Sequence, residues 1–167
     1  MNFLVVSDSH ASKEELVTLL ERHPGLDLYI HCGDSELSSD DPVLEQFQVV
    51  RGNCDMDGRL PNLVTVEVAG VTFLVVHGHQ HQVKTTLTPL GIKAKEVGAD
   101  IACFGHSHEL GCEENNGTVF LNPGSVRLPR GRKECTYILG DVTEDTVFIQ
   151  AKEYPSGDVG KFSFSRT

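Results

Sequence analysis

Aspartate and histidine recur in short pairs along this chain, and both side chains bind metal ions readily. Asp8 and His10 are two residues apart, and so are His106 and His108. In an extended segment residues two apart point the same way, so each pair can converge on one ion. Taken alone, Asp8 and His10 are more typical of a turn and a surface side chain. The second pair follows Gly105, which lets the backbone come close, and it is the strongest single indication of a metal site.

Three further segments offer oxygen or imidazole donors. Asp34 follows a glycine, Asn53 lies in a Gly-Asn-Cys-Asp segment, and His77 begins a stretch with histidine at every second position. A carboxylate can bind one metal or bridge two, and an Asn oxygen is an acceptable ligand for a hard divalent ion. Taken singly, the first two segments are at least as typical of ordinary turns. His77 is expected to face inward, whereas His79 and His81 are rim residues or solvated side chains.

The five segments together change this interpretation, because each directly follows a predicted strand. In α/β folds the functional sites typically lie at the ends of strands. The mixture of oxygen and imidazole donors suits Mn, Fe or Zn rather than Ca or Mg. Seven ligands are too many for one ion and fit two ions that share a carboxylate, which is the arrangement used for in-line displacement at phosphorus. The predicted ligands are Asp8, His10, Asp34, Asn53, His77, His106 and His108.

The elements that must position these residues follow from the apolar pattern. An apolar run at 3–7 predicts a buried strand, Ser12 and Glu15 predict a capping box that begins a helix, and 26–31 predicts a second strand. Strand, helix and strand in this order favour a parallel pair. A hairpin is expected at 64–68 and 71–76, and a helix from Thr88 to Gly98. A short helix is expected at 42–47, and further strands at 48–50, 100–104, 119–122, 136–140 and 146–151.

Composition bounds the class of protein. The 167 residues are expected to form one α/β domain spanning 1–167, and 39% hydrophobic residues suffice for a sizeable core. The net charge of -10 argues against a generic binder of nucleic-acid backbone or of anionic lipid. Five cysteines without a C-x-x-C pair argue against a disulfide framework. With neither a signal peptide nor an apolar run long enough to span a membrane, the protein is predicted to be soluble and cytoplasmic.

The ordered motifs resemble those of calcineurin-like metallophosphoesterases. The motifs are Asp8-x-His10, Gly33-Asp34, Gly52-Asn53-x-Asp55, His77-Gly-His79 and Gly105-His106-x-His108. The short length and the Gly-Asn-Cys-Asp variant resemble the compact bacterial YfcE-like phosphodiesterases, and Asn122-Pro123-Gly124-Ser125 is similar to a loop of that group. The resemblance implies two packed mixed β-sheets flanked by helices. It also implies one ion held by Asp8, His10, Asp34 and His108, and a second held by Asp34, Asn53, His77 and His106, with Asp34 as the bridge.

One position departs from the wider superfamily, which has a histidine where this chain has Cys54. That histidine is credited with helping the leaving group, and a neutral thiol is a poor hydrogen-bond donor. Cys54 is therefore either a weak catalytic group or a small filler beside the site. Asp55 matches the motif and is a further candidate catalytic residue, but it has lost its usual companion, so its role is left open. Asp34 and Asn53 are expected to serve catalysis as ligands. For substrate binding the candidates are His79 and Arg130, although arginines in an exposed turn are more typically solvated.

The sequence thus predicts a dinuclear metal-dependent phosphodiesterase in which a metal-bridging hydroxide attacks phosphorus in line. Two divalent ions per chain are expected, with Mn first and Zn, Fe or Ni as alternatives. The expected partner is a small phosphodiester. We expect neither membrane binding nor a stable nucleic-acid complex, and a homo-oligomer is left open. One alternative is a non-catalytic scaffold like the retromer subunit of eukaryotes, which has this fold and an eroded metal site. The others are a phosphomonoesterase and a nuclease of the same superfamily.

Overall fold

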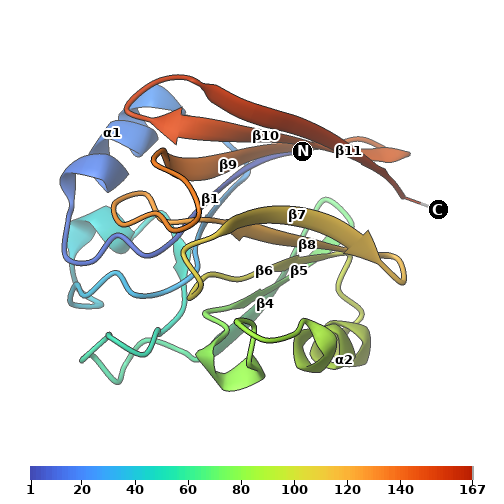
Figure 1. The fold of residues 1–167 in the computed structure, drawn as a ribbon, viewed down its shortest axis with the longest axis horizontal. Coiled ribbons are helices and arrows are strands. Elements are labelled where there is room, and N and C mark those ends of the chain that lie inside the picture. Colours follow the sequence, from blue (N-terminus) through green and yellow to red (C-terminus); the bar gives the residue numbers. More distant parts are fainter. Residues whose placement is uncertain (167) are drawn as a thin grey trace.

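The computed structural model describes residues 1–166. In it two mixed β-sheets pack face to face, and a helix covers the outer face of each sheet (Figure 1). This is the α/β arrangement that the resemblance implied. Among the described residues, no helix is long and apolar enough to cross a bilayer.

The first sheet begins with three parallel strands. β1 (Asn2–Val6) pairs with β2 (Leu28–His31), which pairs with β3 (Gln48–Val49). Helix α1 (Glu14–Arg22) connects β1 to β2, so the predicted parallel pair with a crossover helix is confirmed. On the other side of β1 lie three antiparallel strands, β9 (Cys135–Val142), β10 (Thr146–Tyr154) and β11 (Asp158–Ser165). The order across this sheet is β11-β10-β9-β1-β2-β3.

The second sheet has the order β4-β5-β6-β8-β7. The predicted hairpin is formed by β4 (Leu63–Val68) and β5 (Val71–Val76). β6 (Ile101–Cys103) and β8 (Thr118–Pro123) continue the sheet in parallel, and β7 (Leu110–Asn115) closes it as an antiparallel edge. Helix α2 (Thr88–Val97) joins β5 to β6, and two short 3-10 helices span Pro42–Leu44 and His79–His81.

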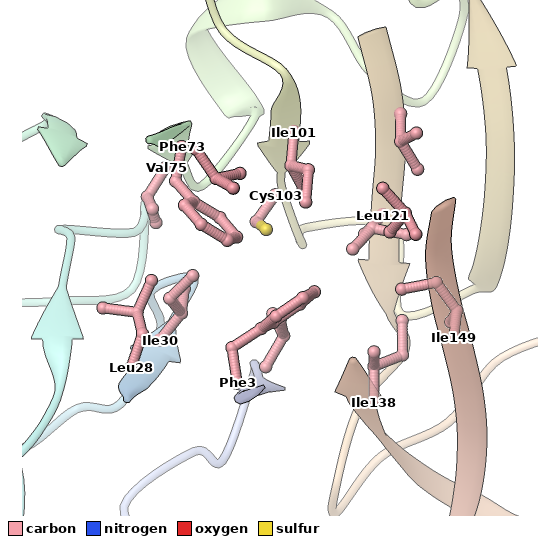
Figure 2. Packing of buried hydrophobic residues seen from close by; sticks show 14 of the residues in the cluster. Phe3, Leu28, Ile30, Phe73, Val75, Ile101, Cys103, Leu121, Ile138 and Ile149 are labelled. Atoms are coloured by element: carbon pink, nitrogen blue, oxygen red, sulfur yellow. The ribbon is translucent and has the colours of Figure 1, made fainter. Parts of the chain in front are cut away.

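The main hydrophobic core lies between the two sheets. Figure 2 shows Phe3, Leu28 and Ile30 of the first sheet facing Phe73 and Val75 of the second. The rings of Phe3 and Phe73 meet edge to face with centroids 5.1 Å apart, a favoured geometry for aromatic pairs. Because this interface is closely packed, the ends of strands from both sheets have fixed positions relative to one another.

Two expectations about local structure were wrong. Ser12 does not cap α1, since the N-cap is Lys13 without a side-chain cap, and the Ser12 hydroxyl instead donates to the Glu15 carboxylate. Strands β7 and β11 were not predicted. Both are edge strands that carry glycine and several exposed polar residues, so neither shows a sustained apolar alternation from which a strand is recognised, although Phe162 and Phe164 alternate with serine in β11.

Candidate metal centre

The predicted ligands gather at the carboxyl ends of five strands. Asp8 follows β1, Asp34 follows β2 and Asn53 follows β3 in the first sheet, whereas His77 follows β5 and His108 lies in the loop after β6 in the second. Because the two sheets face each other, the five loops meet where the sheets adjoin. The site is therefore built across the sheet interface rather than at the edge of one sheet.

Two groups of ligand atoms form within this site. In the first, His108 Nε2 lies 3.2 Å from Asp8 Oδ1 and 3.2 Å from His10 Nε2. In the second, His77 Nε2 lies 3.3 Å from Asp34 Oδ2 and 3.9 Å from Asp8 Oδ1. Within each group all donor atoms lie within 4.8 Å of one another, as three ligands of one ion require. Asp8 belongs to both groups.

One buried acceptor atom at the centre of the site lacks a hydrogen-bond partner. Asp8 Oδ1 is buried and has no hydrogen-bond partner, although its Oδ2 accepts from the Ser7 hydroxyl and from the backbone N–H of His106. A buried carboxylate oxygen without a partner is costly. A cation between Asp8, His10 and His108 removes that cost, so the donor set fits a divalent ion.

Hydrogen bonds of Nδ1 in His77, His108 and His10 fix which ring nitrogen faces the metal site. Nδ1 of His77 lies 2.8 Å from the Cys32 carbonyl and Nδ1 of His108 lies 2.7 Å from the Leu128 carbonyl. A carbonyl can only accept, so both Nδ1 atoms carry a proton and both Nε2 atoms point into the site, where each would offer a lone pair to a metal once the ring is neutral. His10 Nδ1 similarly lies 3.0 Å from Glu36 Oε2. Such outward hydrogen bonds orient metal-binding imidazoles and raise their basicity.

The backbone at these positions adopts an uncommon conformation. Five of the seven predicted ligands have φ in the left-handed region, with values of 55° at Asp8, 43° at His10, 54° at Asp34, 70° at His106 and 60° at His108. The expectation that Asp8 and His10 lie on an extended segment was therefore wrong, and a tight turn brings them together. Non-glycine residues in this region carry strain, which in proteins concentrates at functional sites.

Asp55 organises the loop that presents Asp34. Its buried carboxylate accepts from the backbone N–H groups of Asp34 at 2.9 Å, Glu36 at 2.7 Å and Gly52 at 2.6 Å. All of these donors are backbone groups, so Asp55 holds the shape of the loop. Gly52 is needed for the same approach, because a Cβ at that position would lie 2.0 Å from Asp34 Oδ1.

The segment from Asn122 to Ser125 supports two other ligand loops. The Asn122 amide donates to the Gly105 carbonyl at 3.2 Å and to the Ser107 hydroxyl at 2.9 Å, within the turn that carries His106 and His108. The Ser125 hydroxyl donates to the Asp8 carbonyl at 2.8 Å. Resemblance alone had singled out this segment, and its side chains are buried scaffolding for the ligands.

Sequence reasoning left His31 without a role. It is fully buried, and its Nδ1 accepts from the Gly33 backbone N–H at 3.1 Å, which leaves Nε2 to donate to the Ser9 hydroxyl at 2.8 Å. Burial lowers the pKa of His31 to about 4, so the ring is neutral. His31 thereby ties the Asp8 loop to the Asp34 loop. Its position at the end of a strand, three residues before Asp34, was the only signal for it in the sequence.

The remaining predicted residues lie around this centre. Asn53 Oδ1 is 3.0 Å from His77 Nε2, and the ring of His106 is 5.1 Å from that of His77. His79 is half-buried, with its ring 5.4 Å from the His77 ring. Arg130 is exposed, and its backbone N–H donates to the His108 carbonyl at 2.9 Å. Of these residues, Asn53 approaches the ligand atoms most closely.

Electrostatics act differently on the individual candidate ligands of the metal-free chain. Burial opposes the charge of His77, but its contacts with Asp34 and Asp8 outweigh this and raise its pKa. Contact with Asp8 likewise raises the pKa of His108 despite its burial, so a metal would have to displace a proton from either ring. Burial opposes the charge of Asp34, but its contacts with His77 and Cys54 outweigh this and hold its pKa well below the usual range. Burial, and then the charge of a protonated His77, lower the pKa of His106 to about 4. Burial and the neighbouring Asp34 raise the pKa of Cys54 to about 11, so its exposed thiol is neutral, as expected from its type.

Comparison with known proteins agrees with this geometry. Residues 1–145 match the model of the calcineurin-like phosphoesterase superfamily domain. The chain is 42% identical over 160 residues to the probable metallophosphoesterase YsnB of Bacillus subtilis, with 95% of each chain covered. A predicted phosphoesterase from Streptococcus pneumoniae superposes with a TM-score of 0.95 at 29% identity, covering 99% of this chain and 97% of that one.

Two more distant solved structures share the fold. The YfcE phosphoesterase of E. coli has a TM-score of 0.66 at 19% identity, covering 97% of this chain and 98% of its own. Vps29 of Entamoeba histolytica, solved with zinc, has a TM-score of 0.77 at 21% identity over the whole of both chains. The match to the domain model and the identity to YsnB carry the assignment, and the chain belongs to the calcineurin-like phosphoesterase superfamily.

Proposed function

We propose that this protein is a dinuclear metal-dependent phosphodiesterase. The observation that carries the proposal is the buried, unpartnered Asp8 Oδ1, which lies in both groups of ligand atoms. One group is Asp8, His10 and His108, and the other is Asp8, Asp34 and His77, so two ions have three donors each within reach. Asn53 and His106 would complete the second ion. The bridging role of Asp34 rests on the resemblance, because Asp8 and not Asp34 belongs to both groups.

The residues of the site hold the ligands ready before any metal arrives. Cys32, Leu128 and Glu36 orient three imidazoles with Nε2 inward, and Asp55 holds the Asp34 loop. Two divalent ions bound there would supply a water of lowered pKa and positive charge beside the phosphate oxygens. The mixed oxygen and imidazole donors favour Mn, with Zn, Fe or Ni as alternatives. All five cysteines are free thiols, which supports a reducing, cytoplasmic location.

Two features favour a diester over a monoester. Cys54 is neutral and exposed at the edge of the site, so it contributes no positive charge and donates a hydrogen bond poorly. A dianionic monoester needs more positive charge than a monoanionic diester does. Leaving groups that need little protonation, such as activated aryl groups, are therefore expected to react fastest.

A non-catalytic scaffold is the second candidate, because Vps29 structures share the fold. The intact ligand set argues for the enzyme. All seven predicted ligands are present in this chain, and three of their imidazoles are oriented by buried or charged acceptors.

Metal analysis combined with turnover of a matched pair of aryl esters tests the proposal. We expect about two Mn per chain and faster hydrolysis of bis-4-nitrophenyl phosphate than of 4-nitrophenyl phosphate. Asp34→Asn should bind less metal and lose most activity, since the bridging carboxylate is removed. Metal-loaded protein that hydrolyses neither ester would favour the scaffold, and equal or better turnover of the monoester would contradict diester preference. Full activity in Asp34→Asn would contradict the bridging role.

A further inference from the structure

A cavity of about 510 Å³ lies beside the metal centre. Its wall combines the loop after β2, the loop after β3 and the turn after β1, through Ala11, Glu36, Leu37, Ser38, Cys54, Met56 and Asp57. This volume is within the range of pockets that bind small molecules.

Two of the lining residues also contact the metal centre. Glu36 Oε2 lies 3.0 Å from His10 Nδ1, and the backbone N–H of Cys54 donates to Asp34 Oδ1 at 2.8 Å. A phosphate ester whose phosphorus lies at the ligand atoms therefore has this cavity within reach of one of its ester groups.

The charge of the cavity wall is negative. Glu36 and Asp57 contribute carboxylates, and none of the lining residues is Lys or Arg among the residues that the structure describes. Asp57 is paired with Arg59, so the unbalanced negative charge of the wall comes from Glu36. The nearby Arg59 is already engaged, because it donates to Asp57 at 2.9 Å and to Asp40 at 2.7 Å. A second anionic group on a substrate would meet like charge here without a free cation to balance it.

The rest of the wall is apolar or weakly polar. Ala11, Leu37 and Met56 contribute hydrocarbon and thioether surface, beside the thiol of Cys54. Met56 is 93% exposed, so an apolar ligand in the cavity would cover surface that now faces water. The thioether is flexible and polarisable and contacts aromatic rings favourably.

We propose that this cavity is the subsite for one ester group of the substrate, and that it selects an uncharged aryl or other apolar group over one bearing a further anionic group. The inference rests on the proposed phosphodiesterase function and narrows its substrate class. It excludes diesters whose neighbouring group is another phosphate, as in a nucleic-acid strand, and favours small diesters of an uncharged alcohol or phenol.

Binding of two aryl methylphosphonates to the Mn-loaded protein tests the subsite directly. The methyl group is small, so the aryl group is the one that can fill the cavity, and calorimetry measures the affinity without turnover. We expect phenyl methylphosphonate to bind at least about fivefold more tightly than its 4-carboxyphenyl counterpart, because a carboxylate in the cavity would meet the negative charge of Glu36. A ratio below fivefold, or no binding of either compound, would overturn the subsite.

A charge variant and a matched control separate the cavity from the overall charge of the protein. Met56→Lys places a cation at the exposed rim and should bring the two affinities to within about twofold. Ile92→Lys makes the same charge change at a 66% exposed apolar residue on α2 and should leave the ratio at the wild-type value. Equal responses to both substitutions would overturn the subsite.

Turnover of 4-nitrophenyl methyl phosphate and its 3-carboxy derivative separates this inference from the proposed function. Both proposals predict hydrolysis, and the subsite predicts a lower kcat/KM for the derivative. If neither ester is hydrolysed but the phosphonates bind in the expected order, the phosphodiesterase proposal fails, and only selective binding of an uncharged aryl group in the cavity is supported. If both are hydrolysed while the phosphonates bind equally, the reverse holds.

Discussion

Cys54 and Asp55 are neighbours in the chain with separate roles. Asp55 is buried and accepts three backbone N–H groups, so its contribution is the shape of the Asp34 loop. Cys54 is exposed beside Glu36 and His10, and its thiol is free to meet a substrate. This role of Asp55 does not depend on a histidine at position 54, because its backbone contacts need no side chain there.

Replacing Cys54 with histidine should restore a proton donor at the edge of the site. We expect Cys54→His to raise kcat/KM for 4-nitrophenyl phosphate about tenfold or more, because an imidazolium adds both positive charge and an acid. Cys54→Ser keeps a small neutral side chain and should leave the monoester rate near the wild-type value. Steady-state kinetics of the Mn-loaded variants check this, and no gain in a folded, metal-loaded Cys54→His would contradict the leaving-group argument.

His31 makes stability depend on pH through its burial. Its pKa is lowered from 6.5 to about 4 in the folded chain, so the unfolded chain binds more protons between these values. The contribution of the neutral His31 ring to the free energy of unfolding is complete above pH 6.5 and is lost as the pH falls toward 4. At pH 5 this loss amounts to about 2 kcal/mol.

The variant His31→Gln should remove that pH dependence. Gln lacks a group that titrates in this range and can still donate to Ser9. Urea unfolding of the metal-free proteins at pH 7 and pH 5 measures the effect. We expect the free energy of unfolding of the wild type to fall by about 2 kcal/mol more than that of the variant over this interval. Equal falls would show that His31 is not the titrating group.

The elements that carry the ligands differ in how well their sequences predict them. Buried strands and the β4–β5 hairpin have clear apolar patterns, and their predicted positions are confirmed. The edge strands β7 and β11 lack such a pattern because much of their surface faces water. The ligand residues could be named from their types and order. The left-handed turns that aim them could not, because non-glycine residues rarely adopt that conformation and only the packed loops enforce it.

Close approach of the loops makes one glycine critical. In Gly52→Ala the new methyl group would collide with Asp34 Oδ1, which must move away from the site. We expect a loss of about 1–3 kcal/mol in stability and at least a tenfold loss in Mn affinity. Gly111→Ala in β7 meets nothing within 4 Å and should change neither quantity. Thermal unfolding and calorimetric titration with Mn compare the two variants, and unchanged Mn affinity in Gly52→Ala would contradict the predicted role of Asp34.

At the scale of the whole molecule, the net charge of -10 does not describe the cleft. Each divalent ion adds two positive charges, so two bound ions leave the chain at about -6. The positive charge is concentrated where the carboxylates converge, while the exposed surface stays acidic. A small phosphate ester can therefore enter, whereas a long polyanion meets a repulsive surface.

Metal binding should also stabilise the entire fold. A ligand at one hundred times its Kd adds about 2.7 kcal/mol to the free energy of unfolding, which raises the Tm of a domain of this size by roughly 5–10 °C. We expect Mn to raise the Tm of the chelator-treated wild type by at least this amount and that of Asp34→Asn by clearly less. Scanning calorimetry with and without Mn checks the expectation, and a wild-type Tm indifferent to Mn would contradict a metal site of this affinity.

Each of the two groups of ligand atoms draws on both sheets, with Asp8 from the first sheet and His77 or His108 from the second. An ion held there would be a removable cross-link between the two halves of the sandwich, in a chain whose cysteines are all free. Separation of the sheets would then require that ion to lose ligands from one of them. The half-life of the folded chain in the presence of cellular proteases would then be governed by the rate at which the metal dissociates. Depletion of the metal would therefore lower the amount of the protein as well as its activity.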